Sequence, residues 1–302
     1  MSLEKVRQAL SSVVTINVTP FDADGAVDAE TYEALARRCV DAGIDVLTAN
    51  GNTGEFYSLS RAERDLAVTA TVTAAGDRAT VLVGVGHDVA EARAAARAGA
   101  HGVMVHQPVH PYQSTEGWVE YHRRIADAVP DLGVVCYVRS PRLTSAAFVA
   151  LADACPNLVG VKYAVPDPLA LAELVEAVGP RWVWSCGLAE TWAPYFWLSG
   201  ARGFTSGLAT VAPAHSLELL AQLHAGDFAT AMGTWRRLRP FEDMRARDGS
   251  ALNVSVVKEA LAQLGLCRAD VRPPIAPLGE AQRAEVTTIL AGLDVVTAPV
   301  AA

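Results

Sequence analysis

Short apolar segments alternate with longer amphipathic segments through the first two-thirds of the chain. Eight apolar segments predict strands, at 13–18, 45–49, 80–85, 102–106, 133–138, 158–163, 182–186 and 203–206. Segments rich in Ala, Leu, Arg and Glu lie between them and predict helices, at 29–42, 61–75, 89–98, 116–129, 145–154, 168–178 and 190–199. Near-continuous apolar strands separated by helices indicate parallel pairing, with both faces of the sheet covered. Eight such strands favour an α/β fold, a closed (β/α)8 TIM barrel, over an open doubly wound sheet.

The alternation stops near residue 214, and only helical patterns follow, at 214–224, 228–247, 254–264 and 279–293. The first of these predicts the eighth helix of the barrel, and the others predict a C-terminal helical appendix. We therefore expect a barrel domain at 1–224 and a helical extension at 225–302.

Composition fits this architecture and excludes several classes of protein. In 302 residues, 51% are hydrophobic and 19% are charged, which is typical of a globular chain with a large core. The net charge of −8 argues against a nucleic-acid surface, so an anionic substrate would need local Arg or Lys side chains. The five cysteines are scattered, which indicates reduced thiols. No apolar segment approaches a membrane span, and the N-terminus lacks a signal-peptide pattern, so we expect a cytoplasmic protein without a membrane partner.

The chemistry of a TIM barrel lies at the C-terminal ends of its strands. The sixth predicted strand ends in a lysine, Lys162, on an otherwise apolar segment. Alternation places Leu158, Gly160 and Lys162 on one face of this strand, and the missing side chain of Gly160 favours that face as the interior, with room for a ligand or a long lysine.

Two interpretations of Lys162 remain open on the strand alone. The lysine could extend out of the barrel toward a carboxylate. Alternatively, desolvation could lower its pKa and make it a nucleophile that forms a Schiff base with a ketone. A Schiff base is an electron sink, so this chemistry needs neither a metal nor another cofactor.

Two neighbouring features favour the Schiff-base interpretation. Tyr137 ends the fifth strand, beside the sixth, where a phenol could move protons to and from a substrate. After the second strand, Gly51, Asn52 and Thr53 begin a polar glycine loop suited to a carboxylate, with Thr53 facing the ligand.

Further candidates for substrate binding follow other strands. Arg139 and Arg142 could each hold a carboxylate through a bidentate fork, although a solvated loop is the simpler interpretation of Arg139. The end of the seventh strand and the eighth strand contribute Gly187, Thr205 and Ser206. The histidines His87, His106 and His110 lie near the predicted mouth. The spacing of His106 and His110 could suggest a metal site, but no third ligand at a recognisable spacing accompanies them, so we expect no metal.

Together these residues resemble the dihydrodipicolinate synthase / N-acetylneuraminate lyase family of class I aldolases. The resemblance extends over essentially the whole chain and rests on Thr19-Pro20-Phe21, the segment 51–59 (Gly-Asn-Thr-Gly-Glu-Phe-Tyr-Ser-Leu), Tyr137, and the segment 158–162 (Leu-Val-Gly-Val-Lys). It implies a homotetramer in which Lys162 forms the Schiff base, Tyr137 relays protons, and Thr53 holds the keto-acid carboxylate and contacts the tyrosine.

The chain departs from the synthase pattern at several positions. Asn52 replaces the first of two threonines, and in the segment 138–143 (Val-Arg-Ser-Pro-Arg-Leu) only Arg142 matches the synthases. His110 falls where a neighbouring subunit of the synthases contributes a tyrosine. The segments 54–59, 155–160 and 271–278 instead resemble the branch that contains 5-dehydro-4-deoxyglucarate dehydratase, in which Arg139 matches and Val138 does not.

The resemblance implies a lyase that acts on pyruvate or a 2-keto sugar acid through a lysine imine and enamine. Dehydration of a sugar acid is favoured slightly over aldol cleavage or condensation. A 4-hydroxy-tetrahydrodipicolinate synthase and a non-catalytic barrel that binds a keto acid remain alternatives. A phosphate-binding isomerase fits poorly, because the ends of strands seven and eight lack a glycine-rich cradle.

Overall fold

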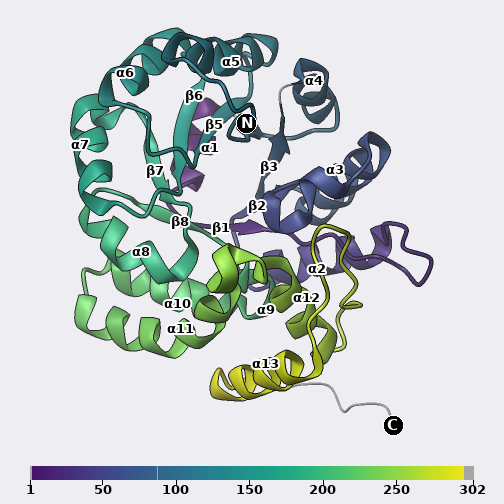
Figure 1. Ribbon diagram of the computed structural model, residues 1–302. Coiled ribbons are helices and arrows are strands. Elements are labelled where there is room, and N and C mark those ends of the chain that lie inside the picture. The colour runs from purple at the N-terminus through teal and green to yellow at the C-terminus, as the bar shows by residue number, and fades with distance from the viewer. Residues whose placement is uncertain (1, 87, 296–302) are drawn as a thin grey trace.

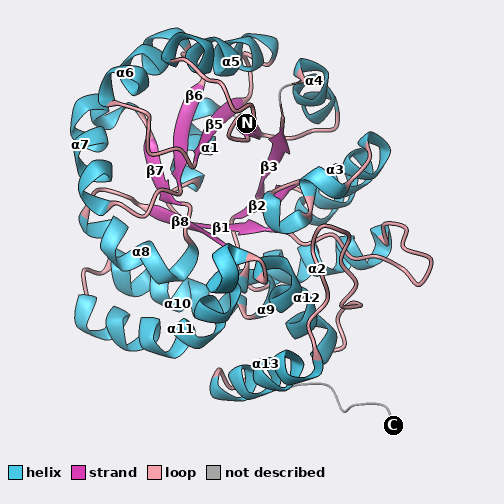
Figure 2. Cartoon of the chain, viewed as in Figure 1, coloured by secondary structure: helices cyan, strands magenta, loops and turns pink. Residues whose placement is uncertain are grey.

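The computed structural model describes residues 2–86 and 88–295, and its centre is a closed barrel of eight parallel strands that pair in chain order (Figure 1, Figure 2). The strands are β1 Val13–Ile16, β2 Val46–Ala49, β3 Thr80–Val85, β4 Gly102–Val105, β5 Gly133–Val138, β6 Leu158–Tyr163, β7 Val183–Cys186 and β8 Gly203–Ser206. The predicted (β/α)8 fold is confirmed, and each predicted strand differs from the observed one by at most two residues at either end.

Helices surround the barrel as the sequence pattern predicts. They are α2 Ala29–Asp41, α3 Arg61–Ala75, α4 Val89–Arg97, α5 Thr115–Ala128, α6 Ser145–Ala154, α7 Pro168–Val178, α8 Ala189–Leu198 and α10 Pro213–His224. Side-chain caps define several of their starts. Asp28 and Asp167 each accept a hydrogen bond from a first-turn amide, and Ser60 forms a reciprocal capping box with Glu63.

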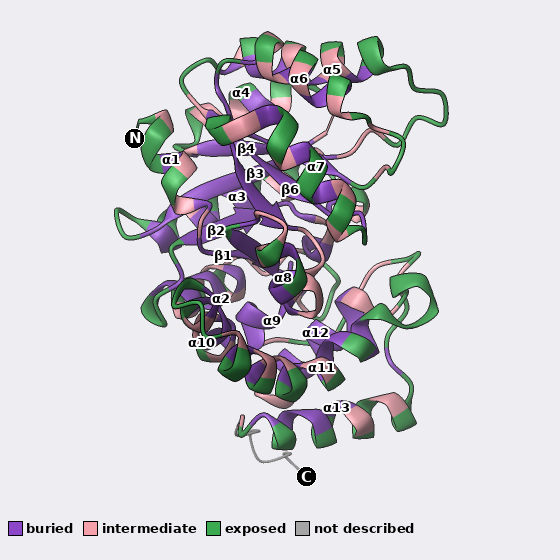
Figure 3. Ribbon diagram, turned by 90° about the vertical axis from the view of Figure 1, so that its left-hand side faces the viewer, coloured by how far each residue is buried: buried purple, intermediate pink, exposed green. Residues whose placement is uncertain are grey.

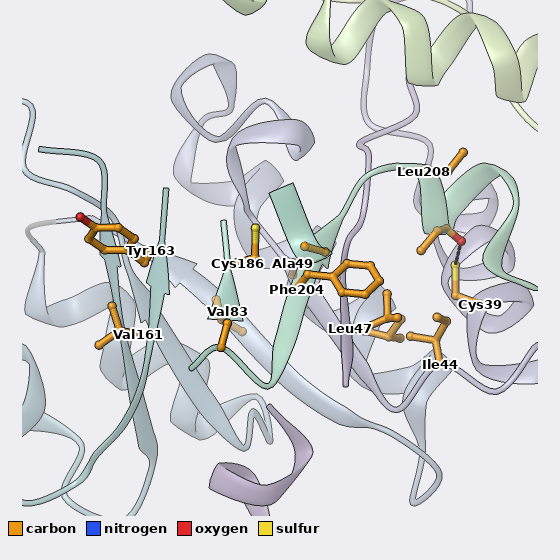
Figure 4. Packing of buried hydrophobic residues seen from close by; sticks show 14 of the residues in the cluster. Cys39, Ile44, Leu47, Ala49, Val83, Val161, Tyr163, Cys186, Phe204 and Leu208 are labelled. Carbon is orange, nitrogen blue, oxygen red and sulfur yellow. Dashed lines mark hydrogen bonds between the residues drawn. The ribbon is translucent and has the colours of Figure 1, made fainter. Parts of the chain in front are cut away.

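A large apolar layer fills the space between the strands and the surrounding helices (Figure 3). Figure 4 shows part of this layer, including Phe204 of β8, Leu47 of β2 and Cys39 of α2. The Cys39 thiol donates to the carbonyl oxygen of Ala209, with Sγ and O 3.7 Å apart. Burial of both faces explains why the strands have near-continuous apolar sequences.

A short helix that the sequence pattern did not reveal, α1 Leu3–Ala9, closes the N-terminal end of the barrel. Val6 and Leu10 belong to the interior apolar cluster, together with Val14 and Val135. A Cβ on Gly160 would lie 2.5 Å from Leu10 Cδ1. The expectation that Gly160 makes room for a ligand or the lysine is therefore wrong, because its missing side chain accommodates Leu10.

Strand β6 contains an irregularity that alters its alternation. Val134 pairs with Leu158 and Val135 pairs with Gly160, so Val159 has no opposite residue. This is the geometry of a β-bulge. Leu158 consequently packs in the outer layer and Val159 in the interior, which corrects the predicted face of Leu158. Beyond the bulge the expected alternation holds for Val161, in the outer layer, and for Lys162, which lines the cavity at the barrel mouth.

The C-terminal part packs on one side of the barrel (Figure 1). It contains α9 Leu208–Val211, α11 Phe228–Ser250, α12 Asn253–Gln263 and α13 Glu280–Gly292. Helix α11 packs against α8 and α10, and the helical geometry is interrupted at Arg247, Asp248 and Gly249, where the predicted helix ends. The division into 1–224 and 225–302 stays a prediction, and residues 296–302 lie outside the described part.

None of the helices in the described part is both long and apolar enough to cross a membrane.

Candidate active site

A cavity of about 540 Å³ lies at the C-terminal ends of the strands. Strand ends and the glycine loop form one side of the cavity, and the helices that follow the barrel form the other. Of the predicted site residues, the cavity gathers Asn52, Thr53, Tyr137, Arg139, Lys162, Gly187, Thr205 and Ser206. Gly51, Arg142 and His110 are not among its lining residues.

Lys162 is only 5% exposed, and among the described residues no carboxylate lies within ion-pair distance of its Nζ. Nζ lies 4.2 Å from the centroid of the Tyr137 ring. Burial, followed by the positive charges of Arg139 and Arg245, lowers the pKa of Lys162 to about 7. A large share of the amine is therefore neutral at neutral pH, as a nucleophile requires.

Tyr137 is the residue paired with Lys162 in the β5–β6 ladder, and Ser185 of β7 is paired with Lys162 on the other side. Burial raises the pKa of the Tyr137 phenol above its ordinary value, so the phenol keeps its proton at neutral pH. The side-chain amide of Asn52 donates to Tyr137 Oη over 3.5 Å. Among the described residues, Asn52 is the hydrogen-bond partner of the phenol. The hydrogen bond expected between Thr53 and the phenol is therefore not present.

The glycine loop that carries Asn52 and Thr53 has an unusual backbone. Asn50 and Glu55, on either side of the short turn η1 Asn52–Gly54, have left-handed conformations with φ of 59° and 60°. A Cβ on Gly51 would lie 2.3 Å from Ile16 Cγ2, so the missing side chain of Gly51 allows the loop to pack against β1, and a substrate contact from Gly51 stays a prediction. The first amides of a helical turn have no acceptor within it, so the N–H groups of Asn52 and Thr53 are not used by η1 itself.

His106 holds the start of this loop through a hydrogen bond to its backbone. It is 1% exposed, and its Nε2 lies 2.9 Å from the carbonyl oxygen of Asn50, which requires a proton on Nε2. Burial lowers the pKa of His106 to about 4, so the ring is neutral. Its role in the structure is to fix the start of the loop.

An ion pair buried at the other end of the loop links it to the C-terminal helices. Glu55 Oε1 lies 2.6 Å from Lys258 Nζ of α12, and both side chains are fully buried. Glu55 Oε2 accepts from the backbone amide of Arg272 over 2.8 Å. Lys258 also donates to the carbonyl oxygen of Asp270. The appendix therefore holds the loop from outside the barrel.

The two arginines after β5 differ in position. Arg139 is exposed and lines the cavity. Arg142 is exposed outside it, and its amide donates to Ser140 Oγ. His110 is exposed as well and contacts its neighbour Tyr112, with Nδ1 2.8 Å from the Tyr112 carbonyl oxygen. A contribution of His110 to a neighbouring subunit stays a prediction, and His87 lies outside the described residues.

Ser206 lines the cavity, but its hydroxyl is engaged elsewhere. It donates to Glu190 Oε1 over 2.6 Å, and Ser216 donates to the same oxygen over 2.5 Å. Burial and the negative charge of Glu242 raise the pKa of the Glu190 carboxyl to about 7. Thr205 donates to the Cys186 carbonyl oxygen. A Cβ on Gly187 would approach Ala164 Cβ to 2.7 Å, so Gly187 allows close packing of the strand ends.

Sequence reasoning missed the residues that α11 and α12 bring to the cavity. Arg245 is 4% exposed and Glu242 is 6% exposed, and their ion pair of 2.6 Å faces the cavity beside Asn253. In the sequence, an acidic and a basic residue three positions apart on a helix are typical of a solvated surface pair. Only packing of the appendix against the strand ends reveals their place.

In the part of the chain that the structure describes, no three His, Cys, Asp or Glu side chains are grouped so as to hold a metal ion. The expectation of a metal-free site stays a prediction.

Comparison with known proteins places this geometry in context. The model of the dihydrodipicolinate synthetase family matches residues 9–293. A probable 5-dehydro-4-deoxyglucarate dehydratase of Xanthomonas campestris is 32% identical over 300 residues, covering 95% of this chain and 97% of that protein. A 4-hydroxy-tetrahydrodipicolinate synthase of Mycolicibacterium paratuberculosis is 34% identical, covering 89% and 90% of the two chains.

Solved structures agree with this assignment. A dihydrodipicolinate synthase from Oceanobacillus iheyensis superposes with a TM-score of 0.92 at 35% identity, covering 97% of this chain and 99% of the other. The sequence match, the fold and the strand-end lysine lead to one conclusion: the chain belongs to the dihydrodipicolinate synthetase family.

Proposed function

We propose that this Schiff-base lyase removes water from a 2-keto-3-deoxy sugar acid, with Lys162 as the amine and Tyr137 as the proton carrier. The observation that supports it most is the pairing of the two side chains. Lys162 is buried without a carboxylate partner among the described residues, and Tyr137 stands opposite it in the ladder. A neutral amine beside a protonated phenol is what imine formation requires.

The first half of the reaction builds the imine. Lys162 Nζ attacks the C2 ketone and forms a carbinolamine. Tyr137 donates a proton to the carbinolamine hydroxyl, which leaves as water. The substrate carboxylate lies at the glycine loop, where the hydroxyl of Thr53 and the loop amides receive it, and the Asn52 amide orients the phenol.

The second half removes the hydroxyl group. The Tyr137 phenolate that the first half leaves behind takes a proton from C3, which converts the imine to an enamine and restores the phenol. The enamine electrons then expel the C4 hydroxyl, which takes up a proton and leaves as water. Hydrolysis of the remaining conjugated imine releases the unsaturated keto acid and restores the Lys162 amine.

The names of the relatives bear on the choice of reaction. The Xanthomonas campestris relative is named for 5-dehydro-4-deoxyglucarate, whose name describes a six-carbon diacid with a ketone beside one carboxylate, a deoxygenated carbon next, and then a hydroxyl. This is the arrangement that enamine-assisted loss of water needs. The second candidate is condensation of pyruvate with an aldehyde, which the synthase relative supports through its 34% identity. A non-catalytic barrel that binds a keto acid would not need the buried amine.

Borohydride trapping followed by intact-mass measurement tests the amine. We expect a covalent adduct with a 2-keto acid in the wild-type chain and none in Lys162→Ala. No adduct with any keto acid, or an adduct that persists in Lys162→Ala, would contradict the proposal. Tyr137→Phe should slow imine formation on the order of 10²-fold, as for loss of a positioned acid–base group. Assays with 5-dehydro-4-deoxyglucarate, and with pyruvate plus aspartate semialdehyde, then separate dehydration from condensation.

We further propose a homotetramer that works in the cytoplasm. Large apolar side chains are exposed on neighbouring helices, with Leu169 on α7 and Leu198 on α8 at 78% and 72% exposure. Exposed apolar side chains of this kind favour contact with another subunit. All five thiols are free, as in a reducing compartment. A monomeric mass by light scattering at micromolar concentration would contradict the tetramer.

A further inference from the structure

The junction of α11 and α12 forms one wall of the cavity. Its lining residues include Glu242, Arg245, Ser250 and Asn253. The sequence predicted no ligand contact from this part, and the mechanism above uses none of these side chains. They nevertheless share one cavity with Lys162.

The Arg245 guanidinium is held in a fixed position. Nη1 donates to Glu242 Oε1 over 2.6 Å, Nη2 donates to Asn253 Oδ1 over 3.1 Å, and Nε donates to the Asn253 carbonyl oxygen over 3.3 Å. Guanidinium has five N–H groups, so within the described part of the chain three are satisfied by the protein and two remain. A buried arginine with donors to spare is prepared to bind an anion.

Gly207, just after β8, gives this guanidinium access to the barrel end. A Cβ at Gly207 would lie 2.5 Å from Arg245 Nη2 and 2.9 Å from its Cζ. Any other residue would displace the guanidinium. The glycine and the arginine therefore fit one another across the boundary between barrel and appendix.

The charges of the cavity as a whole favour an anionic ligand. Its charged lining side chains are Arg139, Lys162, Arg245 and Glu242. With Lys162 neutral, two cations face one anion, in a chain whose net charge is −8. The glycine loop supplies a place for the carboxylate beside the ketone, and the surplus positive charge lies elsewhere in the cavity.

We propose that Arg245 binds a second carboxylate, at the end of the substrate remote from the imine, and thereby makes the enzyme selective for 2-keto dicarboxylic acids. Glu242 and Asn253 are positioning residues that hold the fork toward the cavity. The inference rests on the proposed function, because the keto group must be joined to Lys162 for the far end to reach this wall. A volume of about 540 Å³ leaves room for a chain longer than pyruvate.

Imine formation with two probes tests the inference. Pyruvate has no second carboxylate, whereas 2-oxoadipate carries one at the far end. We expect the wild-type chain to reach half-maximal borohydride-trapped adduct at a lower concentration of 2-oxoadipate than of pyruvate. Arg245→Gln should raise the half-maximal concentration for 2-oxoadipate on the order of 10- to 100-fold relative to that for pyruvate, as for loss of a charged hydrogen bond, because a change in the pKa of Lys162 affects both probes alike.

Two further variants guard the interpretation. Arg245→Gln leaves the Glu242 carboxylate unpaired, so the double variant Glu242→Gln/Arg245→Gln removes both charges and should show the same selective loss. Arg181→Gln, a surface arginine paired with Asp153, should change neither probe.

The outcomes separate the two proposals. Absence of an adduct with both probes in the wild-type chain contradicts the proposed function. Adducts with both probes but no preference for 2-oxoadipate contradict the inference alone and leave the Schiff-base chemistry intact. Equal losses for both probes in the double variant also overturn the inference, because they assign Arg245 a structural role.

Discussion

Two buried lysines, Lys162 and Lys258, differ in whether a carboxylate stands beside them. Lys162 is 5% exposed and has none among the described residues, whereas Lys258 is fully buried and lies 2.6 Å from Glu55. Both contact an aromatic ring, Tyr137 for Lys162 and Phe21 for Lys258. Burial lowers the pKa of both amines, but Glu55 opposes the shift at Lys258. Burial alone is therefore not enough to make a lysine amine nucleophilic. The amine must also lack a nearby carboxylate that would raise its pKa again.

The two lysines act on the same loop and the same cavity in different ways. Lys258 fixes Glu55 and with it the glycine loop, where Asn52 contacts the phenol. Lys162 stands near the end of β6 and is the residue proposed to supply the reactive amine. The ion pair of Lys258 thus maintains the geometry of the glycine loop, which lines the same cavity as the Lys162 amine.

The largest expected effect is on the free energy of unfolding, and it distinguishes Lys258 from Lys162. Lys258→Met leaves the Glu55 carboxylate buried without its partner, and breaking a buried ion pair in this way costs about 3–5 kcal/mol of unfolding free energy. Urea unfolding measures the loss. The double variant Glu55→Gln/Lys258→Met removes both charges and should regain most of it. A loss below about 1 kcal/mol in Lys258→Met would show that the pair does not hold the loop.

The same substitution at Lys162 should have the opposite sign. Lys162→Met removes an amine whose protonation is unfavourable in the folded chain, so the free energy of unfolding at neutral pH should rise on the order of 1–4 kcal/mol, since each pKa unit corresponds to about 1.4 kcal/mol. The trapped adduct should disappear at the same time. Destabilisation by Lys162→Met would contradict the description of Lys162 as a buried amine without a partner.

The sequence predicted the positions of Lys162, Tyr137 and the glycine loop well, because strand ends are predictable, while the catalytic roles of these residues stay a proposal. Apolar strands followed by polar residues located Lys162, Tyr137 and the glycine loop before any coordinates. The expected contact between Thr53 and Tyr137 was less accurate. Which side chain of the loop reaches the phenol depends on rotamers, and the observed hydrogen bond comes from Asn52.

The features that the sequence did not predict depend on contacts between distant segments. Helix α1 closes the N-terminal end of the barrel, and a β-bulge lies at Val159. Both change which residues face inward, although the sequence pattern of β6 alternates regularly. Arg245 reaches the cavity because α11, beyond the barrel, packs against α8 and α10, and because Gly207 leaves space for its guanidinium. Short-range pattern carries no information about such packing.

The smallest effect is a pH dependence that distinguishes the lysines without removing either. Because the pKa of Lys162 is about 7, the rate of imine formation with pyruvate should rise about tenfold per pH unit below neutrality and level off above it. Arg139 contributes to that low pKa, so Arg139→Gln should move the midpoint to higher pH, and Arg181→Gln should leave it in place.

The free energy of unfolding should also depend on pH through Lys162, in a direction that its lowered pKa determines. Between about 7, the folded pKa of Lys162, and about 10.4, the value for an unfolded chain, the unfolded state binds more protons, so unfolding free energy increases with pH in this window. Lys162→Met should lose that increase. Urea unfolding at several pH values measures the slope, and a slope equal in the wild type and Lys162→Met would place the titrating group elsewhere. Equal slopes would thus remove the distinction between the two lysines, because Lys162 would then not be the group that loses its proton in the folded chain in this window.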